Sequence, residues 1–191
     1  MNSKVKKFNP RIKARIRKNR QILNKTIDNF FDWVKGADLV ELKECNTVED
    51  PVRPELDNVF RRSYGRKIFG VKYKNEIHAV MCFAYTNQIP KSVDELDKFS
   101  HDAYLQSAQR DQKIGQIAIA YTVWSKKKGG GKLIVNEVFK KIKKSNHLNR
   151  LVTLSPLTEM AFKFHSKNGA KLVQVNETTQ NFEYEVEKKR N

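Results

Sequence analysis

The sequence has few cysteines, no long apolar run and a shortage of acidic residues. Its two cysteines, Cys45 and Cys82, lie far apart and outside any Cys-x-x-Cys or Cys/His cluster. This spacing argues against a disulfide framework and a zinc site, so we expect two reduced cysteines and no bound metal. No apolar run approaches the roughly 20 residues of a membrane span, and the charged N-terminus lacks the apolar region of a signal peptide. We therefore expect a cytoplasmic protein without a membrane partner.

Acidic residues number 21 against 38 basic ones, which gives a net charge of +17. Residues 1–20 contain no acid and nine basic side chains: Lys4, Lys6, Lys7, Arg11, Lys13, Arg15, Arg17, Lys18 and Arg20. Such an excess favours an anionic partner, but composition does not distinguish a nucleic acid, a membrane surface and a phosphate-rich ligand. Phe8 is the one aromatic residue of this segment, so base stacking has little support. Salt-sensitive nucleic-acid binding, an acidic protein partner and a solvated helix face stay open as interpretations.

The length of 191 residues, with 39% hydrophobic composition, suits one domain with a substantial core. Apolar residues between positions 11 and 34 recur at helical spacing, and Gly36 ends the pattern. We predict a basic N-terminal helical extension at residues 1–36 and a single domain at residues 37–191, with a helical insert at about 90–112.

Strand and helix signals follow one another through the predicted domain. We predict strands at 37–45, 66–73, 76–86, 113–125, 150–155, 170–175 and 181–187. We predict helices at 55–63, 92–111 (as one or two helices), 130–144 and 157–169. A run of strands followed by strand-helix alternation is typical of a mixed α/β (α+β) sheet covered by helices on both faces.

Three consecutive glycines, Gly129, Gly130 and Gly131, stand between a predicted strand and a predicted helix. A glycine-rich turn at this place presents backbone N–H groups at the positive end of the helix dipole, where a phosphate can bind. Four lysines add positive charge around the turn: Lys126, Lys127, Lys128 and Lys132. The turn is therefore a candidate phosphate cradle.

Two common phosphate-binding motifs do not fit these residues. A Walker A loop requires glycine at position 126 and Ser or Thr at position 133, where this chain has Lys126 and Leu133. A Gly-x-Gly-x-x-Gly fingerprint fails at Ile134.

The spacing Lys126-x-x-Gly129-x-Gly131 resembles the Q/R-x-x-G-x-G/A motif of the GCN5-related N-acetyltransferase (GNAT) superfamily, with lysine at a position where Gln or Arg is usual. The resemblance implies the acyl-CoA N-acyltransferase fold, a central and mostly antiparallel sheet flanked by helices. It also implies acetyl-CoA as cofactor, with its pyrophosphate at residues 126–132. The preceding strand, including Val123 and Trp124, would lie along the pantetheine.

A second element, about thirty residues further on, supports the resemblance. The segment "AFKFHSKNGAKLV" is similar to the family's A-x-x-F-Y-x-K-x-G-F element at Ala161, Phe164, Lys167 and Gly169. It departs from that element at His165, where Tyr is usual, and at Ala170, where Phe is usual. The likeness covers about four fifths of the chain and leaves the basic N-terminal helix outside it.

The family resemblance implies transfer of an acetyl group to an amine, in a small molecule or a protein, by direct attack on the thioester. In place of the family's tyrosine, His165 would protonate the leaving thiolate, for which an ordinary pKa of about 6.5 is suitable. A packing role for His165 is the alternative. Glu159, Tyr121 or Ser155 through water, or solvent, would have to deprotonate the amine.

Two further functions stay open. The segments "LSP" and "FHSKNGAKL" resemble those of malonyl-CoA decarboxylase, which would make Ser155 and His165 the catalytic pair of an acyl-CoA decarboxylase-like activity. A catalytically inactive GNAT-fold protein could instead use its basic surface to bind nucleic acid or a larger assembly. The segments expected to shape an acceptor site, around residues 46–62, 88–112 and 176–182, carry no motif.

Overall fold

The computed structural model describes residues 10–185, with side chains from residue 14 onward. The chain divides into two compact units, Met1–Ala37 and Asp38–Asn191. The described part of the first unit is essentially one helix, α1 (Pro10–Lys35). The predicted basic residues Lys4, Lys6 and Lys7, and the end of the last predicted strand at 186–187, lie outside the described residues. Within residues 10–185, no helix is both long and apolar enough to cross a membrane.

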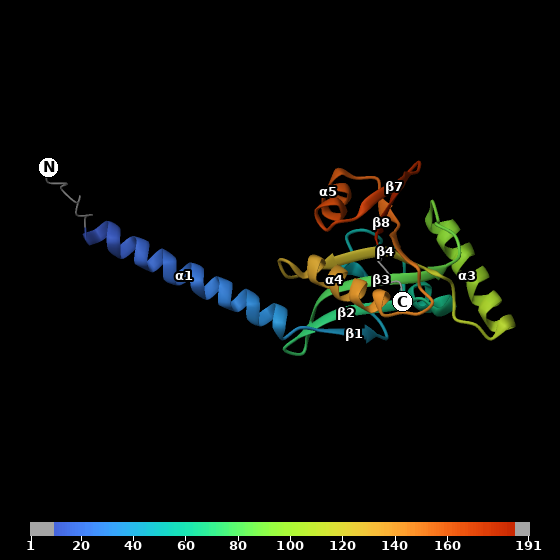
Figure 1. Cartoon of the computed structure of the whole chain (residues 1–191), viewed down its shortest axis with the longest axis horizontal. Coiled ribbons are helices and arrows are strands. Elements are labelled where there is room, and N and C mark those ends of the chain that lie inside the picture. The colour runs from blue at the N-terminus through green and yellow to red at the C-terminus, as the bar shows by residue number, and fades with distance from the viewer. Residues whose placement is uncertain (1–9, 186–191) are drawn as a thin grey trace. The chain divides into compact units, whose positions relative to one another are not determined.

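The second unit is built on an eight-stranded sheet (Figure 1). Its strands are β1 (Asp38–Leu42), β2 (Lys67–Tyr73), β3 (Glu76–Thr86), β4 (Ile117–Ser125), β5 (Arg150–Thr153), β6 (Ser155–Pro156), β7 (Lys171–Val175) and β8 (Thr179–Tyr184). Its helices are α2 (Asn58–Arg62), α3 (Val93–Arg110), α4 (Gly130–Lys143) and α5 (Glu159–Lys167), with short 3-10 turns at Thr47–Glu49 and Ser63–Gly65. The strand order is β1-β2-β3-β4-β5-β8-β6, and β7 pairs with β8.

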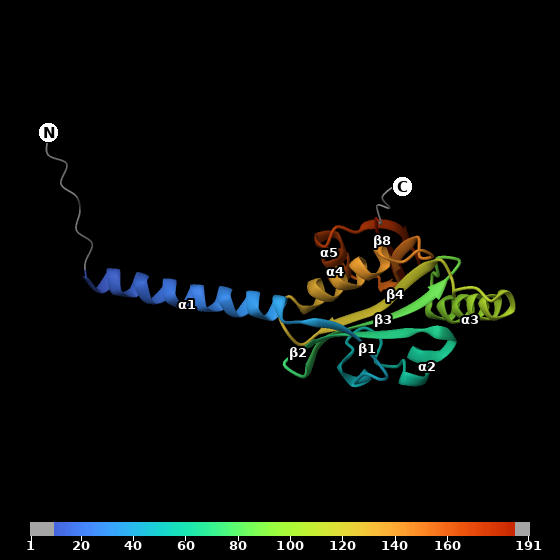
Figure 2. The same ribbon diagram turned by 60° about the horizontal axis from the view of Figure 1, so that its bottom comes forward.

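Helices cover both faces of this sheet, as Figure 2 shows for α4 and α2. On the α2 side, Leu96 of α3 joins a core that contains Ile68, Cys82 and Ile119. Apolar residues of α4, among them Ile134 and Val138, are also buried. All pairings are antiparallel except that of β4 with β5. The predicted mixed, mostly antiparallel sheet flanked by helices is therefore confirmed.

The position of the site depends on where β4 and β5 separate. Their parallel pairing runs from Ile117 opposite Arg150 to Ala120 opposite Thr153. At the same place the register between β3 and β4 shifts, so that Tyr121 is an extra residue, a β-bulge. Beyond it β4 continues to Ser125 without β5, while the chain after β5 forms β6 and pairs with β8. A gap therefore opens between β4 and β6.

The side chain of Arg53 hydrogen-bonds to two backbone carbonyl groups at the start of this gap. Its Nε donates to the carbonyl oxygen of Tyr121 at 2.9 Å and its Nη2 donates to that of Leu154 at 3.0 Å. The two carbonyls belong to the two diverging segments. A buried guanidinium thus replaces the missing strand-to-strand hydrogen bonds, which would otherwise cost free energy.

A fully buried ion pair holds the Arg53 loop against the sheet. The side chains of Asp50 and Arg61 are both 0% exposed, and Arg61 Nη2 lies 2.8 Å from Asp50 Oδ2. Asp50 also accepts the hydroxyl of Thr122 on β4 and the backbone N–H of Arg53. Arg61 in turn donates to the carbonyl oxygens of Leu56 and Arg53. Charged residues beside the two prolines Pro51 and Pro54 are typical of an exposed loop, so the sequence pattern does not indicate this buried network.

Several predicted boundaries differ from the structure. The first strand ends at Leu42 rather than 45. The segment predicted as one or two helices at 92–111 is a single helix with Ser92 as its N-cap, which agrees with the prediction. The last strand begins at Thr179 rather than 181. Residues Thr179–Phe182 are all buried, because β8 is paired on both edges, with β5 and β6 on one side and β7 on the other. Sequence alternation alone did not indicate this central position.

We expect Asp50→Ala to lower the free energy of unfolding by about 3–5 kcal/mol, because it leaves the Arg61 guanidinium buried without its carboxylate. Denaturant titration followed by circular dichroism would measure the change. Asp57→Ala is the matched control in the same loop, since Asp57 only caps α2 by accepting the N–H of Phe60. Its loss should cost about 1 kcal/mol. Equal effects of the two substitutions would contradict a special role for the buried pair.

Candidate functional site

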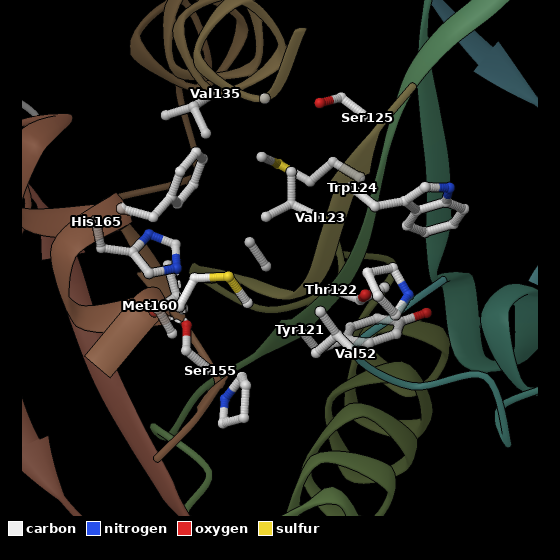
Figure 3. Close-up of a pocket in the computed structure, with 18 of the residues that line it drawn as sticks. Val52, Tyr121, Thr122, Val123, Trp124, Ser125, Val135, Ser155, Met160 and His165 are labelled. Atoms are coloured by element: carbon white, nitrogen blue, oxygen red, sulfur yellow. Dashed lines mark hydrogen bonds between the residues drawn. The ribbon is translucent and has the colours of Figure 1, made fainter. Parts of the chain in front are cut away.

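An apolar pocket occupies the gap between β4 and β6 (Figure 3). Residues 121–125 of β4 line it along one side, and Ser155, Met160, Phe164 and His165 line it on another. Gly131 and Val135 of α4 also contribute to its lining. Among the described residues that line it, no Asp, Glu, Lys or Arg is present. The pocket therefore suits an uncharged chain that leads toward a few polar groups.

The glycine turn lies at the β4–α4 junction. Gly129 adopts φ +85°, a left-handed conformation that favours glycine, and α4 begins at Gly130. A Cβ on Gly131 would lie 3.2 Å from Cε2 of Phe164, and one on Gly130 would lie 3.0 Å from Cβ of Ser125. The N–H of Gly130 donates to the carbonyl oxygen of Lys127 at 2.9 Å, and that of Leu133 donates to the carbonyl oxygen of Gly129 at 3.0 Å. The amides of Gly131 and Lys132 between them have no carbonyl one turn earlier within the helix, so they can donate to an anion. The turn has the backbone geometry of a phosphate cradle.

The predicted lysines are distributed around this turn in different ways. The Nζ of Lys126 forms an ion pair with Oε2 of Glu49 at 2.7 Å, so its side chain is held toward the 47–49 turn. The Nζ of Lys127 lies 4.8 Å from the ring centroid of Tyr73. Lys128 and Lys132 are exposed. The backbone of the turn, with Lys128 and Lys132, is therefore better placed for an anion than the Lys126 side chain.

The side chains of β4 divide between the pocket and the opposite face. Figure 3 shows Val123 directed into the pocket, and the rings of Trp124 and Tyr121 directed away from it. The Trp124 ring has the Arg61 guanidinium carbon 5.4 Å from its centroid. The Tyr121 ring packs edge-on against Phe60, with centroids 6.0 Å apart, and burial raises the pKa of its hydroxyl well above the ordinary value. The structure does not bring Tyr121 together with Ser155 and His165, and the Trp124 ring lies on the opposite face of β4 from the pocket.

Ser155 and His165 do meet, at the polar end of the pocket (Figure 3). The Oγ of Ser155 lies 2.9 Å from Nε2 of His165, and Nδ1 of His165 lies 3.0 Å from the hydroxyl oxygen of Tyr184. The Ser155 hydroxyl is also 3.0 Å from Oγ1 of Thr153. The imidazole stacks on Phe182, with centroids 5.0 Å apart. Four residues from β5, β6, α5 and β8 thus form one hydrogen-bonded chain.

The protonation state of His165 follows from its burial. The residue is 5% exposed, and desolvation lowers the pKa of its imidazole to about 4. The ring is therefore neutral near pH 7, with one nitrogen donating and the other accepting. If Tyr184 donates to Nδ1, then Nε2–H donates to Ser155, whose own hydroxyl hydrogen can turn from Thr153 to a ligand in the pocket.

A carboxylate that could act as a base is not part of this arrangement. Glu159 stands at the start of α5, but its side chain is 79% exposed and pairs with Nζ of Lys163 at 2.6 Å. Its position matches that of a first-turn carboxylate favoured by the helix dipole. The chemistry that the pocket can supply is hydrogen bonding to an oxygen atom in apolar surroundings.

Sequence reasoning did not identify Tyr184, Thr153 or Arg53 as part of the site. A signal for Tyr184 was present, since Phe182 and Tyr184 are two residues apart and so share one face of a strand. That face could not be assigned to His165 from the sequence, because the pairing of β8 with β5 and β6 is set by tertiary contacts.

Comparisons with known proteins agree with this architecture. No protein-family model matches the chain, and no curated protein matches it. Among solved structures, the GphF GNAT-like decarboxylase in complex with isobutyryl-CoA aligns with a TM-score of 0.61 at 8% identity, over 78% of this chain and 100% of that chain. The loading GNATL domain of CurA from Lyngbya majuscula aligns with a TM-score of 0.57 at 12% identity, over 78% and 98%. A Bacillus subtilis acetyltransferase in complex with CoA aligns with a TM-score of 0.53 at 12% identity, over 78% and 98%.

At these identities the comparisons establish the fold. The second unit has the GNAT fold, so the expected resemblance is confirmed at the level of the fold, and a GNAT-like decarboxylase is among the similar structures. A likeness in fold does not by itself assign the ligands or reactions of those proteins to this chain.

We expect stability to fall between about pH 6.5 and pH 4 through His165. In that window the unfolded chain binds a proton on this imidazole while the folded protein, with a pKa of about 4, does not. The loss should be about 3 kcal/mol at the lower end, and no contribution is expected above pH 7.

Denaturant titrations across this range would test the expectation. His165→Gln should flatten the pH dependence, whereas the control His101→Gln, which removes a half-exposed imidazole on α3, should keep it. A His165→Gln protein that loses stability as steeply as the parent would show that another group is responsible.

Proposed function

We propose that this protein is an acyl-CoA-dependent enzyme that acts on the acyl group itself, by decarboxylating a short 2-carboxyacyl-CoA of the malonyl type. The observation that carries the proposal is the hydrogen-bonded pair of Ser155 and neutral His165 at the end of a pocket without charged side chains. The likeness in fold to a GNAT-like decarboxylase adds support.

CoA fits the residues at the other end of the pocket. The glycine turn offers helix N-terminal amides to the pyrophosphate, and a Cβ at Gly131 would intrude on Phe164 where the ligand must pass. Val123 and the backbone of β4 would contact the pantetheine. Lys128 and Lys132 would add positive charge beside the phosphates.

The proposed reaction breaks the bond between the carboxylate carbon and C2 of the acyl chain. The electron pair of that bond moves toward the thioester carbonyl and forms an enolate oxygen, while CO₂ leaves. A proton from solvent then adds to C2, so malonyl-CoA plus one proton yields acetyl-CoA and CO₂. The Ser155 hydroxyl would donate to the enolate oxygen, and Nε2–H of His165 would hold Ser155 in place. An apolar pocket weakens solvation of the carboxylate and so favours its loss.

Amine acetylation with acetyl-CoA is the second candidate, favoured by the glycine turn and by the likeness in fold to an acetyltransferase in complex with CoA. It requires a base for the ammonium acceptor and an acid for the thiolate. The described pocket residues include no carboxylate, and an imidazole with a pKa of about 4 is a weak proton source near neutral pH. Decarboxylation needs neither group, so it fits the geometry better.

We expect the purified protein to convert malonyl-CoA to acetyl-CoA, measured by liquid chromatography of the CoA esters. Ser155→Ala should lower kcat roughly 100- to 1000-fold, as expected for removal of a hydrogen bond to a developing oxyanion. The matched control Ser166→Ala, at an exposed position of α5, should retain activity.

Acetyl-CoA incubated with a panel of amines and peptides would be followed in parallel. Amine acetylation without malonyl-CoA turnover would replace the decarboxylase proposal with the second candidate. Binding of CoA without turnover of either thioester would indicate a protein that keeps the fold as a binding module.

A separate prediction concerns the CoA site. In calorimetric titration, Gly131→Trp should abolish CoA binding, because the indole would fill the cradle beside Phe164. The control Asn136→Trp places the same side chain on an exposed position of α4 and should bind CoA as the parent does. Equal binding by both variants, with both folded, would contradict the assignment of the turn.

A further inference from the structure

Helix α1 carries an apolar stripe that the proposed enzyme activity does not use. Ile16, Leu23, Ile27, Phe30 and Val34 are spaced by seven, four, three and four residues. At 3.6 residues per turn they fall within about 60° of the helix circumference. The first four are large side chains with exposed fractions between 42% and 58%. Phe31, which packs edge-on against Phe30, lies beside the stripe.

The rest of the circumference is strongly basic. Helix α1 contains eight Lys or Arg residues and two acids, Asp28 and Asp32, which gives it a net charge of +6. Before Asp28 the helix has no acidic residue, and Arg15, Arg17, Lys18, Arg20 and Lys25 are all exposed. None of these five falls within the apolar arc. The helix therefore combines one narrow apolar face with a mainly cationic surface on its other sides, where Ile22 is also apolar and is 56% exposed.

This combination decides between the possible occupants of the stripe. A second copy of the helix would cover the apolar residues but would place the basic residues of both copies side by side, without acids to compensate over residues 10–27. A nucleic acid would neutralise the charge but leave the Ile, Leu and Phe side chains in water. An anionic lipid surface would cover the apolar residues and also neutralise the basic ones, because the apolar side chains enter the acyl boundary while the basic side chains remain among the phosphates.

We propose that α1 binds the surface of an anionic membrane, lying in its plane with the stripe of Ile16, Leu23, Ile27, Phe30 and Val34 toward the acyl chains. The sequence-based expectation of no membrane partner rested on the absence of a spanning segment, which an interfacial helix does not need. The proposal is independent of the enzyme activity.

The test is co-sedimentation of the full-length protein with vesicles, either of phosphatidylcholine alone or of phosphatidylcholine containing phosphatidylglycerol. We expect at least tenfold stronger binding to the anionic vesicles at low salt, and a large loss at about 0.5 M salt, where screening shortens the reach of the charges. Circular dichroism and the melting temperature would confirm that each variant is folded.

Two double variants with the same change in net charge distinguish the contribution of the apolar stripe to vesicle binding from the contribution of charge. Leu23→Glu with Ile27→Glu places two carboxylates in the stripe and should reduce binding to anionic vesicles more than tenfold. Gln21→Glu with Asn24→Glu places two carboxylates at exposed positions outside the stripe and should reduce it no more than about threefold, through charge alone.

Three results would overturn the proposal. One is no binding of the folded parent protein to either kind of vesicle. Another is an equal loss in both double variants, with undiminished binding of the stripe variant to DNA or to an acidic polypeptide, which would leave charge as the whole cause. The third is a lipid-free oligomer that the stripe variant dissociates and that does not bind vesicles, which would identify a second copy as the occupant.

Discussion

The separation of β4 from β5 after Ala120 and Thr153 is the constraint on which the site depends. Diverging strands lose the hydrogen bonds that each backbone needs, and Arg53 supplies two of them by donating to the carbonyl oxygens of Tyr121 and Leu154. The buried pair of Asp50 and Arg61 holds the Arg53 loop against the sheet. Without this support, the gap that becomes the pocket would have to close or fill with water.

The two ends of the pocket have different physical character. At the glycine turn, backbone amides and lysines favour an anion, and small residues let it approach. At the other end, burial keeps His165 neutral and places it in a chain of hydrogen bonds from Tyr184 to Ser155. A thioester that spans both ends would have its phosphates in the basic region and its carbonyl among the hydrogen-bond donors. This difference between the two ends is the reason why we propose chemistry on the acyl group rather than transfer to an amine.

Much of the domain could be predicted from local patterns. The glycine turn, the amphipathic α4 and the β-branched strand β4 depend on residues close together in the chain, so their places were predicted within a few residues. Ser155 and His165 were also selected as candidates, through resemblance of short segments. Asp50 and Arg53 could not be selected, because charged residues near two prolines in a segment without periodicity look like an exposed loop until their partners on β4 and α2 are known. Arg61 lies in a predicted helix, but its burial depends on the same partners.

The sequence by itself determined the glycine-rich turn and the amphipathic basic helix, because each follows from spacing within one segment. It also determined the class of fold, through the order of strand and helix signals along the chain. Only the tertiary structure decided that Tyr184 hydrogen-bonds to His165, that Tyr121 faces away from it and that Arg53 bridges the diverging strands. Those contacts join residues between 19 and 101 positions apart. The pKa of His165 was decided in the same way, since desolvation depends on everything packed around the ring and not on its neighbours in the chain.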